Sequence, residues 1–204
     1  RMREGDRLLR KGGFPGGQSN HLAGSAVSGK VLGLVGGGGR IGRAVAKRDH
    51  GFSMEVLYWG PRRKPERDEK DFGLTYVPFD ELLKRSDFVS LHPPLNAETR
   101  HMIGDRELAL MKPTAFLINT SRGPIVDDDA LVDALERKAI AGAGLDAFAV
   151  EPLPADHPYR RLPNVVATPH IGYVTEDCYR IFYDQIVEDI TAWRGGAPVR
   201  VITP

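Results

Sequence analysis

The chain has 204 residues, of which 41% are hydrophobic, so it can bury a sizeable core and is not broadly disordered. A formal net charge of +1 gives no reason to expect a nucleic acid or an anionic membrane as a partner. Cys178 is the only cysteine, which excludes an internal disulfide and a cysteine-based zinc cluster and fits the reducing cytoplasm that we expect for this protein.

The first residues predict the end of a helix followed by a long loop. Residues 4–11 read EGDRLLRK, with Leu8 and Leu9 on one side, and residues 12–29 are rich in glycine, serine and proline. Since a domain rarely begins in this way, we expect a segment upstream of residue 1 in the parent protein.

Short apolar segments then alternate with helical patterns. Strands are predicted at 30–35, 54–59, 74–79, 87–94, 115–119, 141–148 and 164–170, and helices from about residue 41, at 80–86 and at 128–138. Residues 60–71 are polar and read as turns. This alternation predicts an α/β fold, a doubly wound parallel sheet of the Rossmann type with helices on both faces.

A last helix is predicted near the C-terminus from an apolar stripe at helical spacing. The stripe consists of Tyr179, Phe182, Tyr183, Ile186, Val187 and Ile190.

Residues 35–46 read VGGGGRIGRAVA and lie between a predicted strand and a predicted helix. Gly37, Gly39 and Gly42 form the G-x-G-x-x-G pattern that binds dinucleotides in this setting: a tight turn, close approach of backbone to a pyrophosphate, and close packing of helix on strand. The run has one glycine more than the pattern needs, so the register could also begin at Gly36. The alternative is a flexible loop without a ligand.

The end of the second predicted strand bears on the choice of cofactor. NAD-binding folds carry an acidic residue there, which holds the ribose hydroxyls. Here the strand is followed by Gly60 and then by Arg62, Arg63 and Lys64. A 2′-phosphate requires cations, so the sequence favours NADP over NAD. The alternative is a solvated basic turn.

Four later motifs are specific. They are SLHPPLNAETRHMI (90–103), NTSRGPIVD (119–127), GLDAF with EPLP (144–154) and TPHIG (168–172). In this order and spacing the sequence resembles the D-2-hydroxyacid dehydrogenase family, which includes glyoxylate/hydroxypyruvate reductases and phosphoglycerate dehydrogenases. The resemblance implies an oxidoreductase that transfers a hydride between NAD(P)H and a small 2-keto or D-2-hydroxy acid, such as glyoxylate or hydroxypyruvate, and works as a homodimer.

The resemblance implies three catalytic residues, Arg122, Glu151 and His170. Arg122 would bind the substrate carboxylate through parallel hydrogen bonds. His170 would exchange the proton, because an unperturbed imidazole titrates near neutrality, and Glu151 would orient the ring and favour its charged form. Taken singly, each could be an ordinary loop or surface residue, but all three follow predicted strands.

Further cofactor contacts are implied by the same resemblance. Asp146 would hold the nicotinamide carboxamide, the backbone of Arg40 and Ile41 would meet the pyrophosphate, and Pro93 and Thr120 would line the cofactor cleft. Pro93 has no N–H, so any contact there would be through its shape or its carbonyl.

Asp127, Asp128 and Asp129 resemble a metal-binding cluster. We interpret them as the first turn of the helix at 128–138, where acids favour the helix dipole, and predict no metal.

The family also predicts the domain organisation. Residues 1–24 would be the end of an interdomain helix and a loop, residues 25–174 the dinucleotide-binding domain, and residues 175–204 a helix that returns to the substrate domain. Most of the N-terminal substrate domain would be absent. The alternative function is therefore a non-catalytic NAD(P)-binding dimerisation module, of the corepressor kind, or an inactive fragment of a dehydrogenase.

Overall fold

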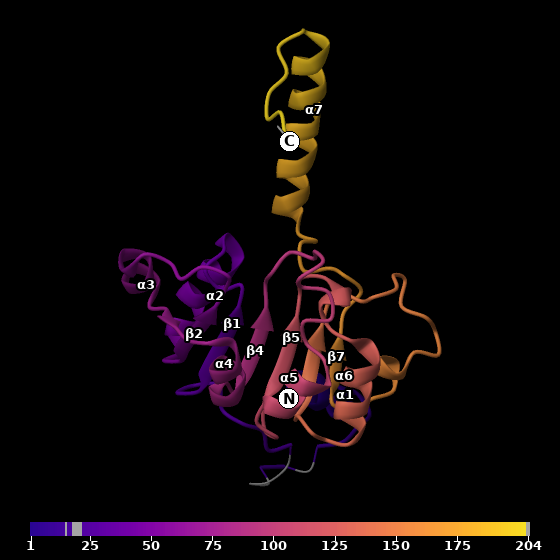
Figure 1. The fold of residues 1–204 in the computed structure, drawn as a ribbon. Helices are drawn as coiled ribbons and strands as arrows, with labels where there is room; N and C mark the ends of the chain where they lie inside the picture. The colour runs from indigo at the N-terminus through magenta and orange to yellow at the C-terminus, as the bar shows by residue number, and fades with distance from the viewer. Residues whose placement is uncertain (15, 18–21, 203–204) are drawn as a thin grey trace.

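The computed structural model describes residues 1–14, 16–17 and 22–202. Its centre is a parallel sheet with the strand order β3-β2-β1-β4-β5-β6-β7 (Figure 1). The strands are β1 (Val31–Val35), β2 (Glu55–Trp59), β3 (Thr75–Tyr76), β4 (Phe88–Leu91), β5 (Phe116–Asn119), β6 (Gly142–Leu145) and β7 (Val165–Ala167). This arrangement confirms the predicted Rossmann sheet.

Helices cover both faces of the sheet because successive strand residues point to opposite sides. On one face, Leu34 and Tyr58 pack in a core with Ala46 of α2 (Arg40–Asp49). On the other, Leu57 and Leu91 pack with residues of α4 (Phe79–Arg85), α5 (Asp105–Leu110) and α6 (Asp128–Glu136).

The prediction of turns throughout residues 60–71 was wrong, because Glu66–Phe72 form the helix α3. Pro65 precedes its first turn, Glu66 and Glu69 favour the positive end of its dipole, and Gly73 ends it in a left-handed conformation with φ of 58°. Charged residues without an apolar stripe hid this helix from the sequence analysis. Helix α5 was also not predicted, and most of the strands are shorter than expected.

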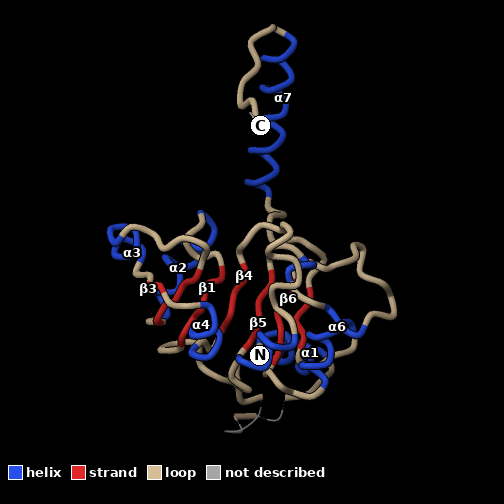
Figure 2. Tube along the Cα trace, in the orientation of Figure 1, coloured by secondary structure: helices blue, strands red, loops and turns tan. Residues whose placement is uncertain are grey.

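All strands are parallel (Figure 1), so the loops that follow them lie at one edge, hereafter the carboxyl edge. Figure 2 shows these loops in tan. Ligands of open α/β sheets bind at this edge, where the strand order reverses. Here the reversal lies between β1 and β4.

The terminal helices differ from the rest. Helix α1 (Met2–Arg10) and helix α7 (Glu176–Arg194) contain no buried residue. Helix α7 projects away from the sheet (Figure 1), and its predicted apolar stripe is exposed to solvent. Within the described residues, no helix is long and apolar enough to cross a membrane. Part of the loop predicted at 12–29 lies outside the described residues.

Candidate active site

The glycine run between β1 and α2 folds so that several of its residues must lack a side chain. Gly36 has φ of 76°, and a Cβ there would lie 2.9 Å from the nitrogen of Pro93. A Cβ on Gly42 would lie 2.5 Å from Cα of Gly37. The contact between Gly37 and Gly42 is the close packing of helix on strand that the register 37-39-42 requires.

The N-terminus of α2 offers free donors beside this loop. Gly39 is the N-cap and provides no side-chain cap. The N–H groups of Arg40, Ile41 and Gly42 therefore have no partner within the helix and form a site suited to an anion. The backbone cradle and these donors fit the pyrophosphate of a dinucleotide. The side chains of Arg40 and Ile41 are exposed.

The basic turn after β2, which is predicted to bind a 2′-phosphate, contains an ion pair with a carboxylate of the protein itself. The guanidinium of Arg63 donates two hydrogen bonds to Glu69, at 2.9 and 2.8 Å. The hydroxyl of buried Tyr58 also donates to Glu69, at 2.8 Å, and burial raises the pKa of Tyr58 to about 12. Arg62 is exposed, and Gly60 is buried with open space where a Cβ would lie.

The loop after β5 carries Arg122 and is held in place by the buried side chain of Asn119. Asn119 accepts a hydrogen bond from the N–H of Ser121 at 3.0 Å and donates to the carbonyl of Arg122 at 2.9 Å. The hydroxyl of Ser121 donates to the carbonyl of Pro93 at 2.6 Å, so the expected cleft residue Pro93 ties the β4 and β5 loops together. Thr120 is exposed at the same edge.

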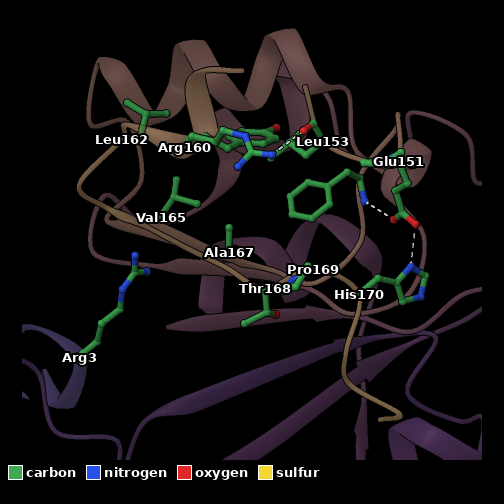
Figure 3. A pocket seen from close by; sticks show the side chains of 13 residues that line it. Arg3, Glu151, Leu153, Arg160, Leu162, Val165, Ala167, Thr168, Pro169 and His170 are labelled. Carbon is green, nitrogen blue, oxygen red and sulfur yellow. Dashed lines mark hydrogen bonds and ion pairs between the residues drawn. The ribbon is translucent and has the colours of Figure 1, made fainter. Parts of the chain in front are cut away.

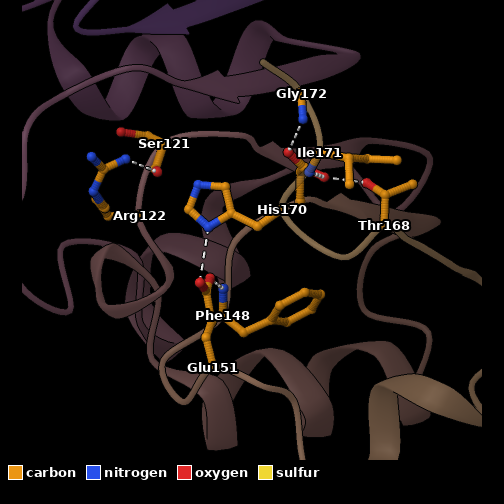
Figure 4. A network of polar contacts seen from close by, with 9 residues as sticks. Ser121, Arg122, Phe148, Glu151, Thr168, His170, Ile171 and Gly172 are labelled. Carbon is orange, nitrogen blue, oxygen red and sulfur yellow. Dashed lines mark hydrogen bonds and ion pairs between the residues drawn. The ribbon is translucent and has the colours of Figure 1, made fainter. Parts of the chain in front are cut away.

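Backbone contact joins this loop to the loop after β6. A Cβ on Gly123 would lie 1.9 Å from the carbonyl carbon of Phe148, so only glycine fits. This contact places Arg122 in the same region as Glu151: the pKa of Glu151 is lowered first by its hydrogen bond with His170, and the positive charge of Arg122 adds a smaller contribution. Figure 4 shows Arg122 beside the ring of His170.

The imidazole of His170 and the carboxylate of Glu151 form a direct pair. Nδ1 of His170 lies 2.9 Å from Oε2 of Glu151, and Oε1 accepts from the N–H of Phe148 at 2.9 Å (Figure 4). The hydrogen bond from His170, followed by that from Phe148, holds the pKa of Glu151 below its ordinary value. An ionised carboxylate accepts Nδ1–H, which leaves Nε2 of the ring for a substrate.

Asp146 is buried and uses its carboxylate to shape the turn after β7. It accepts hydrogen bonds from the hydroxyl of Thr168 and from the N–H groups of Ile171 and Gly172. Burial opposes its ionisation, but these hydrogen bonds keep the pKa of Asp146 below its ordinary value. His170 lies within this turn with φ of 55°. The contacts of Asp146 therefore fix the turn that carries His170.

A cavity of about 820 Å³ borders the His170–Glu151 pair on the β7 side (Figure 3). Its lining is mainly apolar and includes neither Arg122 nor the glycine run.

His92 directly follows β4, which lies between β1 and β5 in the sheet. Its imidazole is hydrogen-bonded to Ser90, and burial lowers the pKa of His92 to about 4. His92 is therefore neutral at physiological pH.

The structure thus brings Arg122, Glu151 and His170 together at one half of the carboxyl edge and the glycine run with the basic turn at the other half. The sequence analysis missed the residues that hold these groups in place, which are Tyr58, Glu69, Asn119 and Gly123. A polar residue at the end of a buried strand was a usable signal for Asn119, whereas nothing local indicated the role of Glu69.

Residues 1–172 match the family described as D-isomer specific 2-hydroxyacid dehydrogenase, NAD binding domain. The chain belongs to this family. A glyoxylate reductase of Thermococcus litoralis is 46% identical over 200 residues, which cover 96% of this chain and 60% of the relative. The chain therefore spans about 60% of the length of this relative.

Solved structures of several enzymes superpose closely on this chain. A putative D-isomer specific 2-hydroxyacid dehydrogenase of Polaromonas superposes with a TM-score of 0.90 at 36% identity, covering 100% of this chain and 63% of that one. An acyclic imino acid reductase in complex with NADPH has a TM-score of 0.83 at 33% identity, covering 99% and 62%. A D-lactate dehydrogenase of Lactobacillus jensenii with NAD+ has a TM-score of 0.83 at 35% identity, covering 100% and 63%.

Proposed function

We propose that the chain provides the cofactor-binding and proton-transfer machinery of an NAD(P)-dependent oxidoreductase acting on a small 2-keto or D-2-hydroxy acid, such as glyoxylate or hydroxypyruvate. The observation that supports this most is the 2.9 Å pair of His170 and Glu151 beside Arg122, at the same edge as the glycine run. The glyoxylate reductase name of the Thermococcus relative supports the choice of substrate class.

Each residue has a defined task in the reduction. Arg122, whose Nη1 donates to the carbonyl of Ser121, presents its remaining donors to the substrate carboxylate. His170 donates a proton from Nε2 to the carbonyl oxygen as that oxygen becomes a hydroxyl. Glu151 keeps the ring oriented through its hydrogen bond with Nδ1. A nicotinamide cofactor, when bound, would supply the hydride for the carbonyl carbon.

For the cofactor, we propose NADP. No carboxylate follows β2, where an acid would bind the ribose hydroxyls of NAD, and three basic residues, Arg62, Arg63 and Lys64, follow instead. The solved relatives include one with NADPH and one with NAD+, so relatives of either kind exist.

We also propose a homodimer as the functional form. Exposed apolar side chains lie on and after β7, with Val166 at 55% and Ile171 at 46% exposure, and this surface is suited to a second copy. Light scattering of the purified chain measures its mass in solution and tests the dimer.

The test of the reaction is turnover of glyoxylate and hydroxypyruvate by the purified chain with NADPH. His170→Gln is expected to reduce kcat at least about 100-fold, the contribution of a positioned general acid, without weakening NADPH binding. His50→Gln is the matched control, because the ring of His50 is hydrogen-bonded to the carbonyl of Phe72 at 2.9 Å and lies between α2 and β2, away from the carboxyl edge. NADPH binding without any turnover by the unsubstituted chain would favour the non-catalytic module instead.

A further inference from the structure

The basic turn after β2 contains a residue whose position differs from those of its neighbours. Arg63 is held by Glu69, and Arg62 is exposed, whereas the aliphatic chain of Lys64 lies across the glycine run. A Cβ on Gly38 would lie 2.5 Å from Cε of Lys64 and 2.9 Å from its Cγ. Gly38 is buried, so Lys64 covers the backbone of the additional glycine in this run.

The backbone of Lys64 is also fixed. Its N–H donates to the hydroxyl of Tyr58 at 2.7 Å, and the same hydroxyl donates to Glu69 at 2.8 Å. Glu69, on α3, is 8% exposed and holds Arg63 through two hydrogen bonds. Helix α3 is tied in turn to α2 by Arg43, whose guanidinium lies 3.3 Å from Asp68. The turn is therefore anchored on a buried strand residue and on two helices.

The same contacts determine which charged groups of the basic turn are already paired within the protein. Glu69 would repel a phosphate, but its two oxygens are matched by the guanidinium of Arg63. In the described part of the chain Lys64 enters none of the ion pairs of this turn, so its ammonium charge is not neutralised by a carboxylate. A dinucleotide on this fold places its pyrophosphate at the start of α2 and its adenosine ribose at the end of β2. Lys64 follows β2 and touches the loop before α2, so it lies between these two places.

We propose that Lys64 is the residue that binds the 2′-phosphate of NADPH, and that Arg63 serves as a positioning residue. Arg63, Glu69 and Tyr58 hold the turn so that Lys64 crosses Gly38. The additional glycine then has a specific use, since any side chain at position 38 would displace Lys64. This inference rests on the proposed cofactor site, and it does not depend on turnover.

The test is a titration of the full chain with NADPH and with NADH, followed by nicotinamide fluorescence. Lys64→Gln is expected to weaken NADPH binding roughly tenfold or more, because one charge-assisted hydrogen bond is lost. NADH binding is expected to weaken by less than about twofold, because NADH has no 2′-phosphate. Lys70→Gln, the same substitution on the exposed side of α3, is the matched control and is expected to change neither. An equal loss for both cofactors, or no loss for either, would overturn the assignment.

Two further variants test the geometry. Gly38→Ala displaces the flexible side chain of Lys64 at little cost to the fold, so it is expected to lower the preference for NADPH over NADH. The double variant Gly38→Ala/Lys64→Gln is expected to bind NADPH no more weakly than Lys64→Gln alone. Full additivity would contradict a shared mechanism. Tyr58→Phe is expected to lower the same preference while the chain stays folded by circular dichroism; an unchanged preference would remove Tyr58 from its positioning role. If the unsubstituted chain bound neither cofactor, the proposed cofactor site itself would fail.

Discussion

The two halves of the carboxyl edge are built by different means. At β5–β7, the loops that carry Arg122, Glu151 and His170 are fixed by backbone contact and by two buried polar side chains, Asn119 and Asp146. At β1–β2, the backbone of the glycine run is equally close-packed, but the basic groups are long side chains, of which only Arg63 is held by an ion pair within the described residues. The first half suits the proposed proton transfer, which requires fixed atoms, and the second suits the proposed binding of the cofactor.

We expect the β5–β7 half to tolerate substitution least. Gly123→Ala places a Cβ 1.9 Å from a backbone carbon, so the β5 and β6 loops must separate. We expect a loss of about 3 kcal/mol or more in the free energy of unfolding, measured in urea, together with loss of turnover.

Gly144→Ala is the control for this variant, because the nearest atom to its Cβ, on Ile118, lies 3.9 Å away. It is expected to change the free energy of unfolding by less than about 0.5 kcal/mol. Equal stabilities of the two variants would contradict the tight backbone contact.

Asp146→Asn is expected to have the next largest effect on stability. The NH₂ group of the new side chain cannot accept the hydrogen bonds that Asp146 accepts, so at least one of the donors on Thr168, Ile171 and Gly172 is left unpaired. The expected loss is about 1–3 kcal/mol in the free energy of unfolding. The pKa of Asp146 is lowered in the folded state, so its stabilisation is present above the unfolded pKa, about 3.9, and is lost as the pH falls through the folded pKa. The difference in the free energy of unfolding between the unsubstituted chain and Asp146→Asn should therefore narrow below about pH 4. A difference that does not depend on pH would contradict an ionised Asp146.

The smallest effect is expected on the binding half, at Arg62. Its side chain is exposed, so solvent and salt screen its attraction for a phosphate. Arg62→Ala is expected to weaken NADPH binding only about two- to threefold, with NADH binding unchanged. A larger loss than that of Lys64→Gln would show that Arg62, and not Lys64, recognises the phosphate.

The sequence predicted the parts of this molecule that depend on local patterns. The strands, the helix after the glycine run and the helix start at Asp127, whose carboxylate accepts from the N–H of Ala130, all follow from spacing and residue type. The placement of Arg122, Glu151 and His170 after β5, β6 and β7 followed from motifs that lie next to predicted strands.

The parts that could not be predicted depend on contacts between distant elements. The pairing of Arg63 with Glu69 requires α3, which carries no apolar stripe, and a hydroxyl from the interior of β2. The cover of Gly38 by Lys64 follows from that pairing and not from the turn sequence itself. Helix α7 shows the opposite case: its stripe predicted the helix correctly, but the pattern does not specify what packs against it.

The most direct test is an NMR titration of the isotope-labelled chain with NADPH, since both halves of the carboxyl edge are proposed to bind one molecule. We expect the amide signals of Gly38–Gly42 and those of Asn119–Arg122 to shift together, with one dissociation constant. Shifts confined to one half, or shifts around the cavity beside β7 alone, would contradict a single dinucleotide site along the carboxyl edge.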